Sequence, residues 1–382
     1  MHFSFALQCA TLGLWATTSA STVPQPPSYM TRAHKAVTKL QTFYNTPTSG
    51  WWSEGWWNTA QCLTLLADLR SVDDSDFIKS ITDGPNGVFT HTLQGQHMDN
   101  GYLAYDGYFD DELWWVIALI QVYDVTGQKK FLEVARLSFE RVVRDDQPTQ
   151  CGGLWNAYDG QPDRVDSTIA TSLFVKAGAL LAARIPSMKD HFLSPALTQL
   201  AWIEQHLLIN GIIAGDELSP YPSCSNDMAY LTYIEGTMIG AYVALWQVTG
   251  EADYMSKAES IASQTLSENF DTLVVNGIIT EFCDHDNSCN ADIAQFKGIL
   301  ARGLRILHAA NPNALNGSIP AFLQKNADSI WGKSKGKNGL LGMNWSGPFV
   351  LVSNAGSAEE NRKVRISSHS SATMALVAAA IV

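Results

Sequence analysis

The sequence predicts an all-α fold in which helical hairpins stack and close into a ring. About a dozen segments carry apolar residues at the three- and four-residue spacing of a helix. Around Gly127 and again around Gly250, an apolar helix, a tight Thr-Gly turn and an amphipathic partner helix follow one another. Hairpins of this kind build closed toroids or open solenoids, and solenoids usually keep a tighter repeat length. We therefore favour a ring in a single domain, with an open solenoid as the alternative.

The first half of the chain contains six expected helices. A short helix near Phe77 precedes a loop rich in Gly, Asn and His. The apolar helix that opens at Asp110 is expected to end at Thr126, because Gly127 readily adopts the left-handed conformation that caps helices. The expected helices of this half lie at residues 31–44, 58–69, around 77, 110–126, 129–143 and 167–183.

The second half continues the same alternation of helices and long loops. Pro195 is expected in the first turn of its helix, where its missing N–H has no partner to lose. Residues 332–366 are Gly-rich, with some strand character at 349–352, and precede the last helix. The expected helices of this half lie at residues 194–208, 237–248, 253–266, 291–310, 319–330 and 370–382.

Composition and charge exclude several classes of partner. The 382 residues are 46% hydrophobic and carry a formal net charge of -12, with one short basic cluster at Lys333, Lys335 and Lys337. Nucleic acids and anionic membranes are therefore unsuitable partners, and a neutral or cationic ligand fits better. No run after the first residues reaches the apolar length that a bilayer demands. The sequence gives no sign of an oligomer, so we expect a monomer.

The N-terminus indicates export from the cell. Residues 1–20 resemble a signal peptide with a weak positive region, residues 21–30 form a disordered leading segment, and residues 31–382 form the domain. The apolar C-terminal tail is short for a lipid-anchor signal and is better explained as the last helix. Asn316 and Asn344 lie in glycosylation motifs, which matter only in a secreted chain.

Five cysteines remain after removal of such a signal peptide, so at least one thiol stays free. Cys283 and Cys289 bracket a short polar loop and form the best candidate for a disulfide. The pairing of Cys62, Cys151 and Cys224 is open.

Asp110 and Asp111 are the candidate catalytic residues. They open an apolar helix and are surrounded by Tyr105, Tyr108 and the pair Trp114 and Trp115. Acidic residues in a first turn often do no more than complement the helix dipole, and this alternative stays open. Aromatic surroundings raise the pKa of a carboxyl group by desolvation, and so does a second carboxylate nearby. One raised and one ordinary carboxyl group form the pair that glycoside hydrolysis uses.

Other side chains are candidates for ligand contact. The candidate sugar-binding residues are Trp51, Trp52, Trp155, Glu235 and Trp345. For the tryptophans core packing is about as plausible as stacking on a sugar, and for Glu235 helix capping is the simpler explanation. Asp284, His285 and Asp286 have the side chains of metal ligands but not the spacing of a known site, so we expect a solvated loop and no metal.

Six segments of the sequence contain motif-like patterns. Residues 109–115 read aromatic-Asp-Asp-x-x-Trp-Trp and residues 151–155 read Cys-Gly-Gly-x-Trp, and the other segments are residues 51–60, 233–240, 296–302, and 345–348 with 370–379. In this order they resemble the motifs of glycoside hydrolase family 76, the family of endo-α-1,6-mannanases and related fungal cell-wall proteins. The resemblance spans roughly residues 30–382. Two departures concern amides: the family's Asn-Gln is Ile234-Glu235 here, and its Lys-Asn-x-Ile-x-Asn region reads Asp166 to Thr171.

The resemblance implies an (α/α)6 toroid and an enzyme, secreted or associated with the cell wall, that cleaves α-1,6-mannosidic bonds in mannan or mannoprotein with retention. By position, Asp110 matches the nucleophile and Asp111 the general acid/base, and no cofactor is implied. Two alternatives stay open. One is a transglycosidase of cell-wall assembly, and the other is a glycan-binding relative without activity.

Overall fold

The computed structural model describes residues 28–44, 52, 55–94, 98–99, 102–103, 107–145, 149–161, 164–267, 273–354 and 356–382. The predicted signal peptide lies outside these residues. The predicted leading segment, residues 21–30, also lies outside them except for residues 28–30. The helices are α1 Tyr29–Gln41, α2 Trp56–Arg70, α3 Asp76–Thr82, α4 Val88–His91, α5 Phe109–Thr126, α6 Lys129–Asp145, α7 Thr168–Arg184, α8 Lys189–His206, α9 Thr232–Thr249, α10 Ala252–Thr265, α11 Ala291–Ala310, α12 Ile319–Lys333 and α13 Ala358–Ile381.

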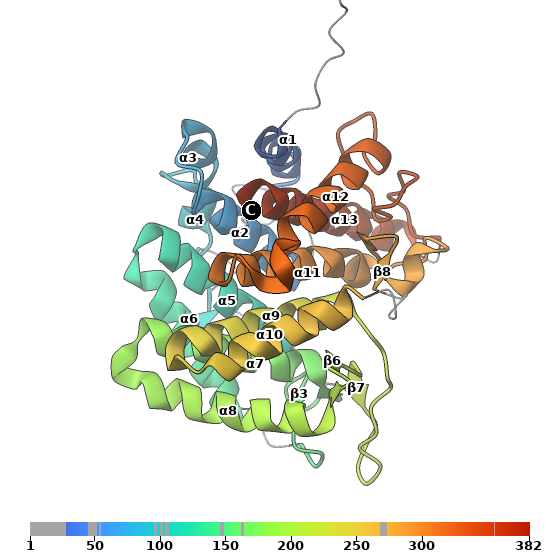
Figure 1. Ribbon diagram of the computed structural model, residues 1–382. Coiled ribbons are helices and arrows are strands. Elements are labelled where there is room, and N and C mark those ends of the chain that lie inside the picture. The colour runs from blue at the N-terminus through green and yellow to red at the C-terminus, as the bar shows by residue number, and fades with distance from the viewer. Residues whose placement is uncertain are drawn as a thin grey trace, which may run out of the picture.

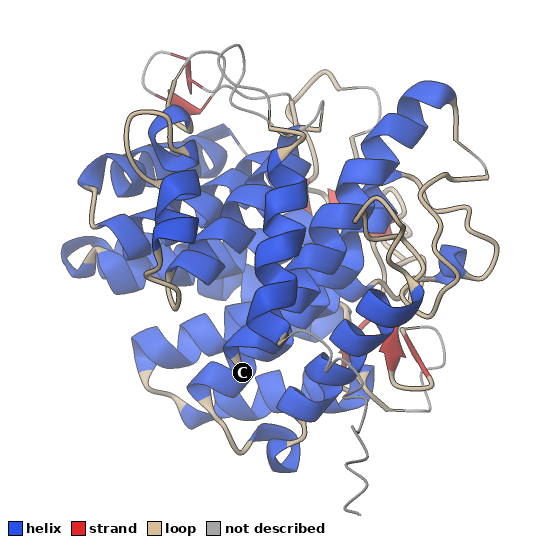
Figure 2. Ribbon diagram, turned by 90° about the horizontal axis from the view of Figure 1, so that it is seen from above, coloured by secondary structure: helices blue, strands red, loops and turns tan. Residues whose placement is uncertain are grey.

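Short strands occur in the loops between helices (Figure 2). They are β1 Met98–Asp99, β2 Tyr102–Leu103, β3 Leu154–Trp155, β4 Asp166–Ser167, β5 Leu208–Ile209, β6 Ile212–Ile213, β7 Glu217–Leu218, β8 Val274–Val275 and β9 Ile278–Ile279. All pairings are antiparallel, and β4 lies between β3 and β7 in a three-stranded sheet.

Six helices form a closed inner ring. Each of α2, α5, α7, α9, α11 and α13 packs against the next, and α13 packs against α2. Most residues of these helices are buried, as expected for helices that are apolar on nearly every side. The outer helices α1, α6, α10 and α12 are amphipathic. Helices α8 and α10 cover α7 and α9 from outside (Figure 1). The predicted all-α toroid is confirmed.

Glycine fixes two features of the ring. The predicted caps of α5 and α9 are present, because Gly127 and Gly250 have φ of 67° and 79° in the left-handed region. Gly236 lets α9 approach α11 closely, since a Cβ there would lie 2.4 Å from the carbonyl oxygen of Ile299. These two features set the direction and spacing of the inner helices.

Three sequence-based expectations are wrong. Helix α8 begins at Lys189, so Pro195 lies inside it, and the burial of Phe192 and Leu193 in the preceding turn offsets the hydrogen bond that proline removes. Helix α13 begins at Ala358, where the Ser357 side chain accepts a hydrogen bond from the Glu360 amide. Residues 349–352 form no strand. The Met343 amide donates a hydrogen bond to the Val350 carbonyl, but no further backbone hydrogen bonds continue this contact as a pair of strands.

The cysteines follow the sequence-based prediction and add one pairing to it. Cys283 and Cys289 are bonded as predicted, and Cys151 is bonded to Cys224. Cys62 is a buried free thiol. Across the described ranges, no helix combines the length and the apolar character needed to cross a membrane.

Candidate functional site

The N-terminal ends of four inner helices meet at one cavity. It has a volume of about 390 Å³. Helices α2, α5, α9 and α11 contribute to it, together with the loop after β3. The lining residues are Trp57, Tyr108, Asp110, Asp111, Trp114, Asn156, Tyr233, Asp292 and Phe296. Three of these are aspartates and none is Lys or Arg, so the described lining carries negative charge.

Asp110 and Asp111 stand in the first turn of α5, next to the positive end of its dipole. Both are half-buried and line the cavity. The Asp111 amide donates a hydrogen bond of 2.9 Å to Asp110 Oδ1. The carboxylates therefore face a shared space, neither sealed in the core nor on the outer wall of the ring.

Glu112, the next residue, fixes the start of α5 to its surroundings. It is 1% exposed and accepts hydrogen bonds from Nε and Nη2 of Arg141 on α6, at 2.9 and 2.5 Å. The Tyr158 hydroxyl donates to its other oxygen at 2.7 Å. A buried carboxylate with a paired guanidinium and a hydroxyl holds one conformation. Glu112 is thus a positioning residue for the two acids before it.

The loop after β3 closes the same end of α5. The Phe109 amide donates to the Asn156 carbonyl at 2.6 Å, and Tyr108 forms a bridge with Ala157. Asn156 Oδ1 in turn accepts from the Val165 amide at 2.8 Å. These backbone contacts place the amide side chain of Asn156 beside the aspartates.

Aromatic rings and a third carboxylate form the opposite wall. Trp57 Nε1 donates to Asp292 Oδ1 at 2.8 Å, and its ring stacks on Trp114 with centroids 5.8 Å apart. Tyr233 stacks on Phe296 at 3.7 Å with nearly parallel planes. Asp292 keeps an exposed surface, yet the protein around its carboxyl group desolvates it and raises its pKa, while the hydrogen bond from Trp57 opposes the shift.

A further carboxylate lies behind this wall. The Tyr233 hydroxyl donates to Asp216 Oδ1 at 2.7 Å. Burial raises the pKa of Asp216 to about 6, against the effect of this hydrogen bond. Asp216 fixes the rotation of the tyrosine ring and so the shape of the cavity.

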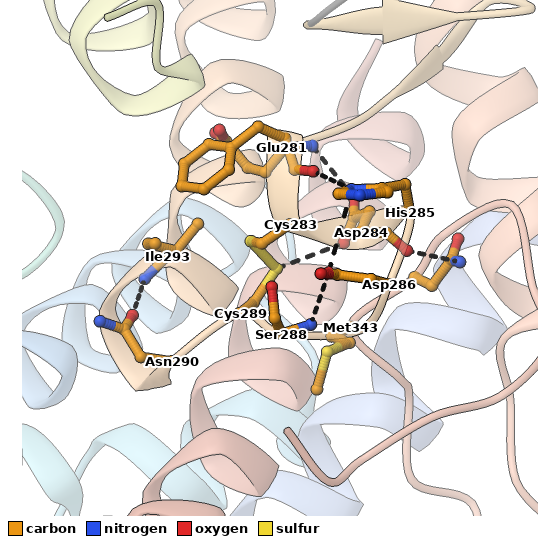
Figure 3. The surroundings of a disulfide bond; sticks show 12 residues. Glu281, Cys283, Asp284, His285, Asp286, Ser288, Cys289, Asn290, Ile293 and Met343 are labelled. Atoms are coloured by element: carbon orange, nitrogen blue, oxygen red, sulfur yellow. Dashed lines mark hydrogen bonds and ion pairs between the residues drawn. A yellow bond between two sulfur atoms is a disulfide. The ribbon is translucent and has the colours of Figure 1, made fainter. Parts of the chain in front are cut away.

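The Cys283–Cys289 loop (Figure 3) leads directly into α11. Helix α11 carries the lining residues Asp292 and Phe296. Asn290 directly follows the disulfide and caps α11, because its Oδ1 accepts from the Ile293 amide at 2.9 Å. Asp284 is paired with the buried Lys297, and His285 is exposed. Within the part of the chain that the structure describes, no group of His, Cys, Asp or Glu residues is arranged to hold a metal ion.

The sequence-based candidates for sugar contact are scattered. Trp51 lies outside the described residues. Trp52 and Trp345 are 2% and 1% exposed and pack in the core, and Glu235 is 0% exposed with the Ile213 amide bonded to it. Trp155 is half-buried and lines a separate cavity. Of the predicted site residues that the structure describes, Asp110 and Asp111 alone line the cavity at the helix ends.

Several lining residues were not predicted from the sequence. Asp292 and Asn156 lie outside the six motifs. Tyr233, Phe296 and Trp57 lie within motifs but carry no separate sign of ligand contact in the sequence. The signal that identifies most of them is shared: an aromatic or acidic side chain within the first turns of an apolar inner helix. The cavity combines acid–base groups with flat apolar walls, which suits proton transfer on a neutral or cationic ligand with apolar faces.

Comparisons with known proteins identify the family and show related folds. Residues 28–376 match the profile of glycosyl hydrolase family 76. The α-1,6-mannanase GH76A of Salegentibacter sp. HEL1_6 is 21% identical, with a TM-score of 0.71 over 92% of this chain and 99% of that chain. Dfg5 from Chaetomium thermophilum, solved with glucosamine, is 16% identical, with a TM-score of 0.70 over 91% and 90%. No curated protein matches. Because the profile covers most of the sequence, the chain belongs to glycosyl hydrolase family 76.

Proposed function

We propose that the protein is a secreted retaining hydrolase of α-1,6-mannosidic bonds in mannan or cell-wall mannoprotein. The observation that carries this proposal is the placement of Asp110 and Asp111. Both are half-buried in one first turn and line a cavity with aromatic walls. Asp110 is the nucleophile and Asp111 the general acid/base, following the family resemblance.

The proposed reaction has two steps, the formation of a glycosyl ester and its hydrolysis. Asp110 attacks the anomeric carbon while the bond to the leaving oxygen breaks, and Asp111 donates its proton to that oxygen. The result is a covalent glycosyl ester on Asp110. Water then attacks the same carbon, Asp111 takes up the proton of the water, and the ester bond breaks to release the sugar and restore both groups.

The remaining lining residues bind the sugar. Trp57, Trp114 and the stacked pair of Tyr233 and Phe296 offer flat apolar surfaces to the faces of sugar rings. Asp292, held by Trp57, is placed to accept hydrogen bonds from sugar hydroxyls. The buried candidates Trp52, Glu235 and Trp345 act on substrate only indirectly, through the packing that supports the cavity.

A relative supports the substrate class. An inactive variant of the Salegentibacter enzyme, 22% identical to this chain with a TM-score of 0.71 over 92% and 99% of the two chains, was solved with α-1,6-mannotriose. Its substitutions fall on two adjacent aspartates, and Asp110 and Asp111 are likewise adjacent. The two described disulfides are typical of proteins that fold in an oxidising compartment, in keeping with secretion.

A second candidate is a transglycosidase that transfers the glycosyl group to another sugar in cell-wall assembly. The fold similarity to Dfg5 with its bound glucosamine favours it, as does a described lining with three aspartates and no cationic side chain. An acceptor sugar would then replace water in the second step, with the same two carboxylates.

Incubation with linear α-1,6-mannan separates these functions. Hydrolysis releases reducing ends, whose first-formed anomer, followed by NMR, is α if the configuration is retained. An initial β anomer would overturn the assignment of Asp110 as nucleophile. Added mannobiose or glucan acceptors yield longer products only if transfer competes with water. Glycan binding without any bond cleavage would support the non-catalytic alternative.

A further inference from the structure

A buried carboxyl group that does not line the cavity, that of Glu281, binds the start of α9. Glu281 directly precedes the short 3-10 helix η3 Phe282–Asp284 and is 1% exposed. Its Oε1 accepts hydrogen bonds from the Thr232 amide, at 2.9 Å, and from the Thr232 hydroxyl. Thr232 is the first residue of α9, so Glu281 satisfies one of the N–H groups that the start of a helix leaves without a partner.

The same turn binds α11. Asp284 accepts a hydrogen bond from the Glu281 amide at 3.0 Å, and the Asp284 amide donates to the Glu281 carbonyl at 2.9 Å (Figure 3). The Asp284 carboxylate also accepts from the buried ammonium group of Lys297 on α11, which donates to the Met343 carbonyl at 2.6 Å as well. The turn is therefore bonded to α9 through Glu281 and to α11 through Asp284.

Each of the two bonded residues is adjacent to a side chain of the cavity wall. Thr232 directly precedes Tyr233, and Lys297 directly follows Phe296. The rings of Tyr233 and Phe296 stack with their centroids 3.7 Å apart and their planes 2° apart, and both line the cavity. Stacking at this distance requires a fixed relative position of α9 and α11, and the turn connects these two helices next to the stacked rings.

The surroundings of Glu281 control its charge. Burial raises the pKa of Glu281 to about 8, while the hydrogen bonds from Thr232 and the charge of Lys297 oppose the shift and Asp284 adds to it. Among the described residues, the charged groups that act on Glu281 are thus Lys297 from α11 and Asp284 from its own turn, and α9 presents the uncharged Thr232. Below pH 8 the neutral group accepts from Thr232 through a carbonyl oxygen. Above pH 8 a buried negative charge lies beside Asp284, which favours a movement of the turn toward water.

We propose that Glu281 is a positioning residue for sugar binding, because it joins the starts of α9 and α11 and so fixes the stacked rings of Tyr233 and Phe296. This role rests on the proposed function, in which the two rings contact the sugar. It differs from the role of Glu112, which holds the start of α5 and its two aspartates. Loss of the Glu281 carboxyl group therefore raises KM and has little effect on kcat.

Variants at position 281 test this role. Glu281→Ala removes the acceptor, so KM for α-1,6-mannan should rise by about tenfold at pH 6, with kcat within a few-fold of the wild-type value. Glu281→Gln keeps a carbonyl oxygen for Thr232 and should restore KM to within about twofold of the wild-type value. Asp286→Ala is the control, since it removes an exposed acid of the same loop whose side chain accepts from the Ser288 amide. This control should change neither value.

The pH profile distinguishes the acceptor from a general effect on packing. Glu281→Gln cannot ionise, so the ratio of the wild-type KM to the KM of this variant should rise between pH 7 and 9. A ratio that stays constant across this range overturns the proposal. So does a Glu281→Gln variant that is as impaired as Glu281→Ala, or a Glu281→Ala variant that is no more impaired than Asp286→Ala. Should Glu281→Ala fail to fold, the comparison of the wild type with Glu281→Gln decides alone.

Fluorine NMR of the full chain labelled with 4-fluorophenylalanine gives a measurement that needs no turnover. The Phe296 signal, assigned from Phe296→Leu, should titrate near pH 8 in the wild type and lose this step in Glu281→Gln. A Phe296 signal with the same pH dependence in both proteins overturns the proposal. A step that disappears in Glu281→Gln, in a protein that does not cleave mannan, supports the link between Glu281 and the cavity wall and counts against the proposed function alone.

Discussion

Helices α5 and α9 are alike except in their first turns. Each has 18 residues, is apolar on nearly all sides and ends at a Thr-Gly pair with the glycine in the left-handed region. Both first turns contain acidic residues. On α5, Asp110 and Asp111 are half-buried and line the cavity at the helix ends, whereas Glu235 on α9 is 0% exposed and faces the protein.

The partners of the acids explain the difference. On α5 the buried acid is Glu112, and a guanidinium and a tyrosine hydroxyl compensate it. Among the described residues, Glu235 has the Ile213 amide as its only hydrogen-bond donor, at 3.2 Å from Oε1 and 3.4 Å from Oε2. Burial therefore raises the pKa of Glu235 well above its ordinary value. An acidic residue in a first turn of this ring acts on a ligand only where it faces the cavity.

The largest expected effect is the loss of activity on changing the α5 pair. In the proposed mechanism Asp110 bonds to the sugar and Asp111 transfers a proton. Asp110→Asn and Asp111→Asn should therefore each lower kcat by about 10²–10⁴-fold or more. Both variants should remain folded, because neither acid is fully buried. Initial rates on α-1,6-mannan, together with circular dichroism, measure this.

Glu235→Gln is the matched control on α9, because it makes the same acid-to-amide change at a buried side chain that does not line the cavity. Its kcat should stay within a few-fold of the wild-type value. Equal losses in all three variants would show that the contrast between the two first turns has no functional meaning.

The second prediction concerns the anchor of α5. Glu112→Ala removes the carboxylate that Arg141 and Tyr158 share, and breaking a buried ion pair from one side costs about 3–5 kcal/mol. Urea unfolding measures the change in the free energy of unfolding. Glu133→Ala on α6, which removes an exposed partner of Arg136, should cost at most about 1 kcal/mol. Similar costs for both would contradict the role of Glu112.

The sequence allowed much of this comparison to be predicted, but not its decisive part. Apolar periodicity and the two Thr-Gly turns predicted both helices, because helix burial and glycine caps are local signals. The local pattern does not show which first-turn acid faces a cavity. That depends on residues far away in the chain, such as Arg141 beside Glu112 and Ile213 beside Glu235.

The same limit explains Asp292 and Trp345. Asp292 belongs to the cavity because Trp57 of α2, 235 positions away, donates to it. Trp345 lies in a Gly-containing loop, a position that favours an exposed side chain. In the structure the side chain is instead buried beside Lys297. Patterns in a single sequence do not reveal which residues so far apart in the chain are in contact.

The third prediction uses the raised pKa of Glu235. A carboxyl group with a raised folded-state pKa contributes stability that is fully present below its unfolded value and is lost as pH rises toward the folded value. Glu235→Gln cannot ionise, so its Tm should match the wild type near pH 4 and exceed it increasingly above pH 5. The gain is at most about 1.4 kcal/mol for each pH unit. Thermal unfolding between pH 4 and 8 tests it, and a constant difference across this range would contradict the buried neutral state.

The smallest expected effect is that of removing the Tyr233 hydroxyl. Tyr233 lies two positions before Glu235 on α9 but lines the cavity. Tyr233→Phe keeps the ring that stacks on Phe296 and removes only the hydroxyl that donates to Asp216. The cavity wall should persist, so kcat/KM should fall by a few-fold, in line with the loss of one hydrogen bond of about 1 kcal/mol. Because that bond lowers the pKa of Asp216, which lies at about 6, its removal should raise the pKa further. Tyr233→Ala removes the ring as well and should lose more activity. Equal losses in the two variants would mean that the hydroxyl, and not the aromatic wall, is what α9 contributes to the cavity.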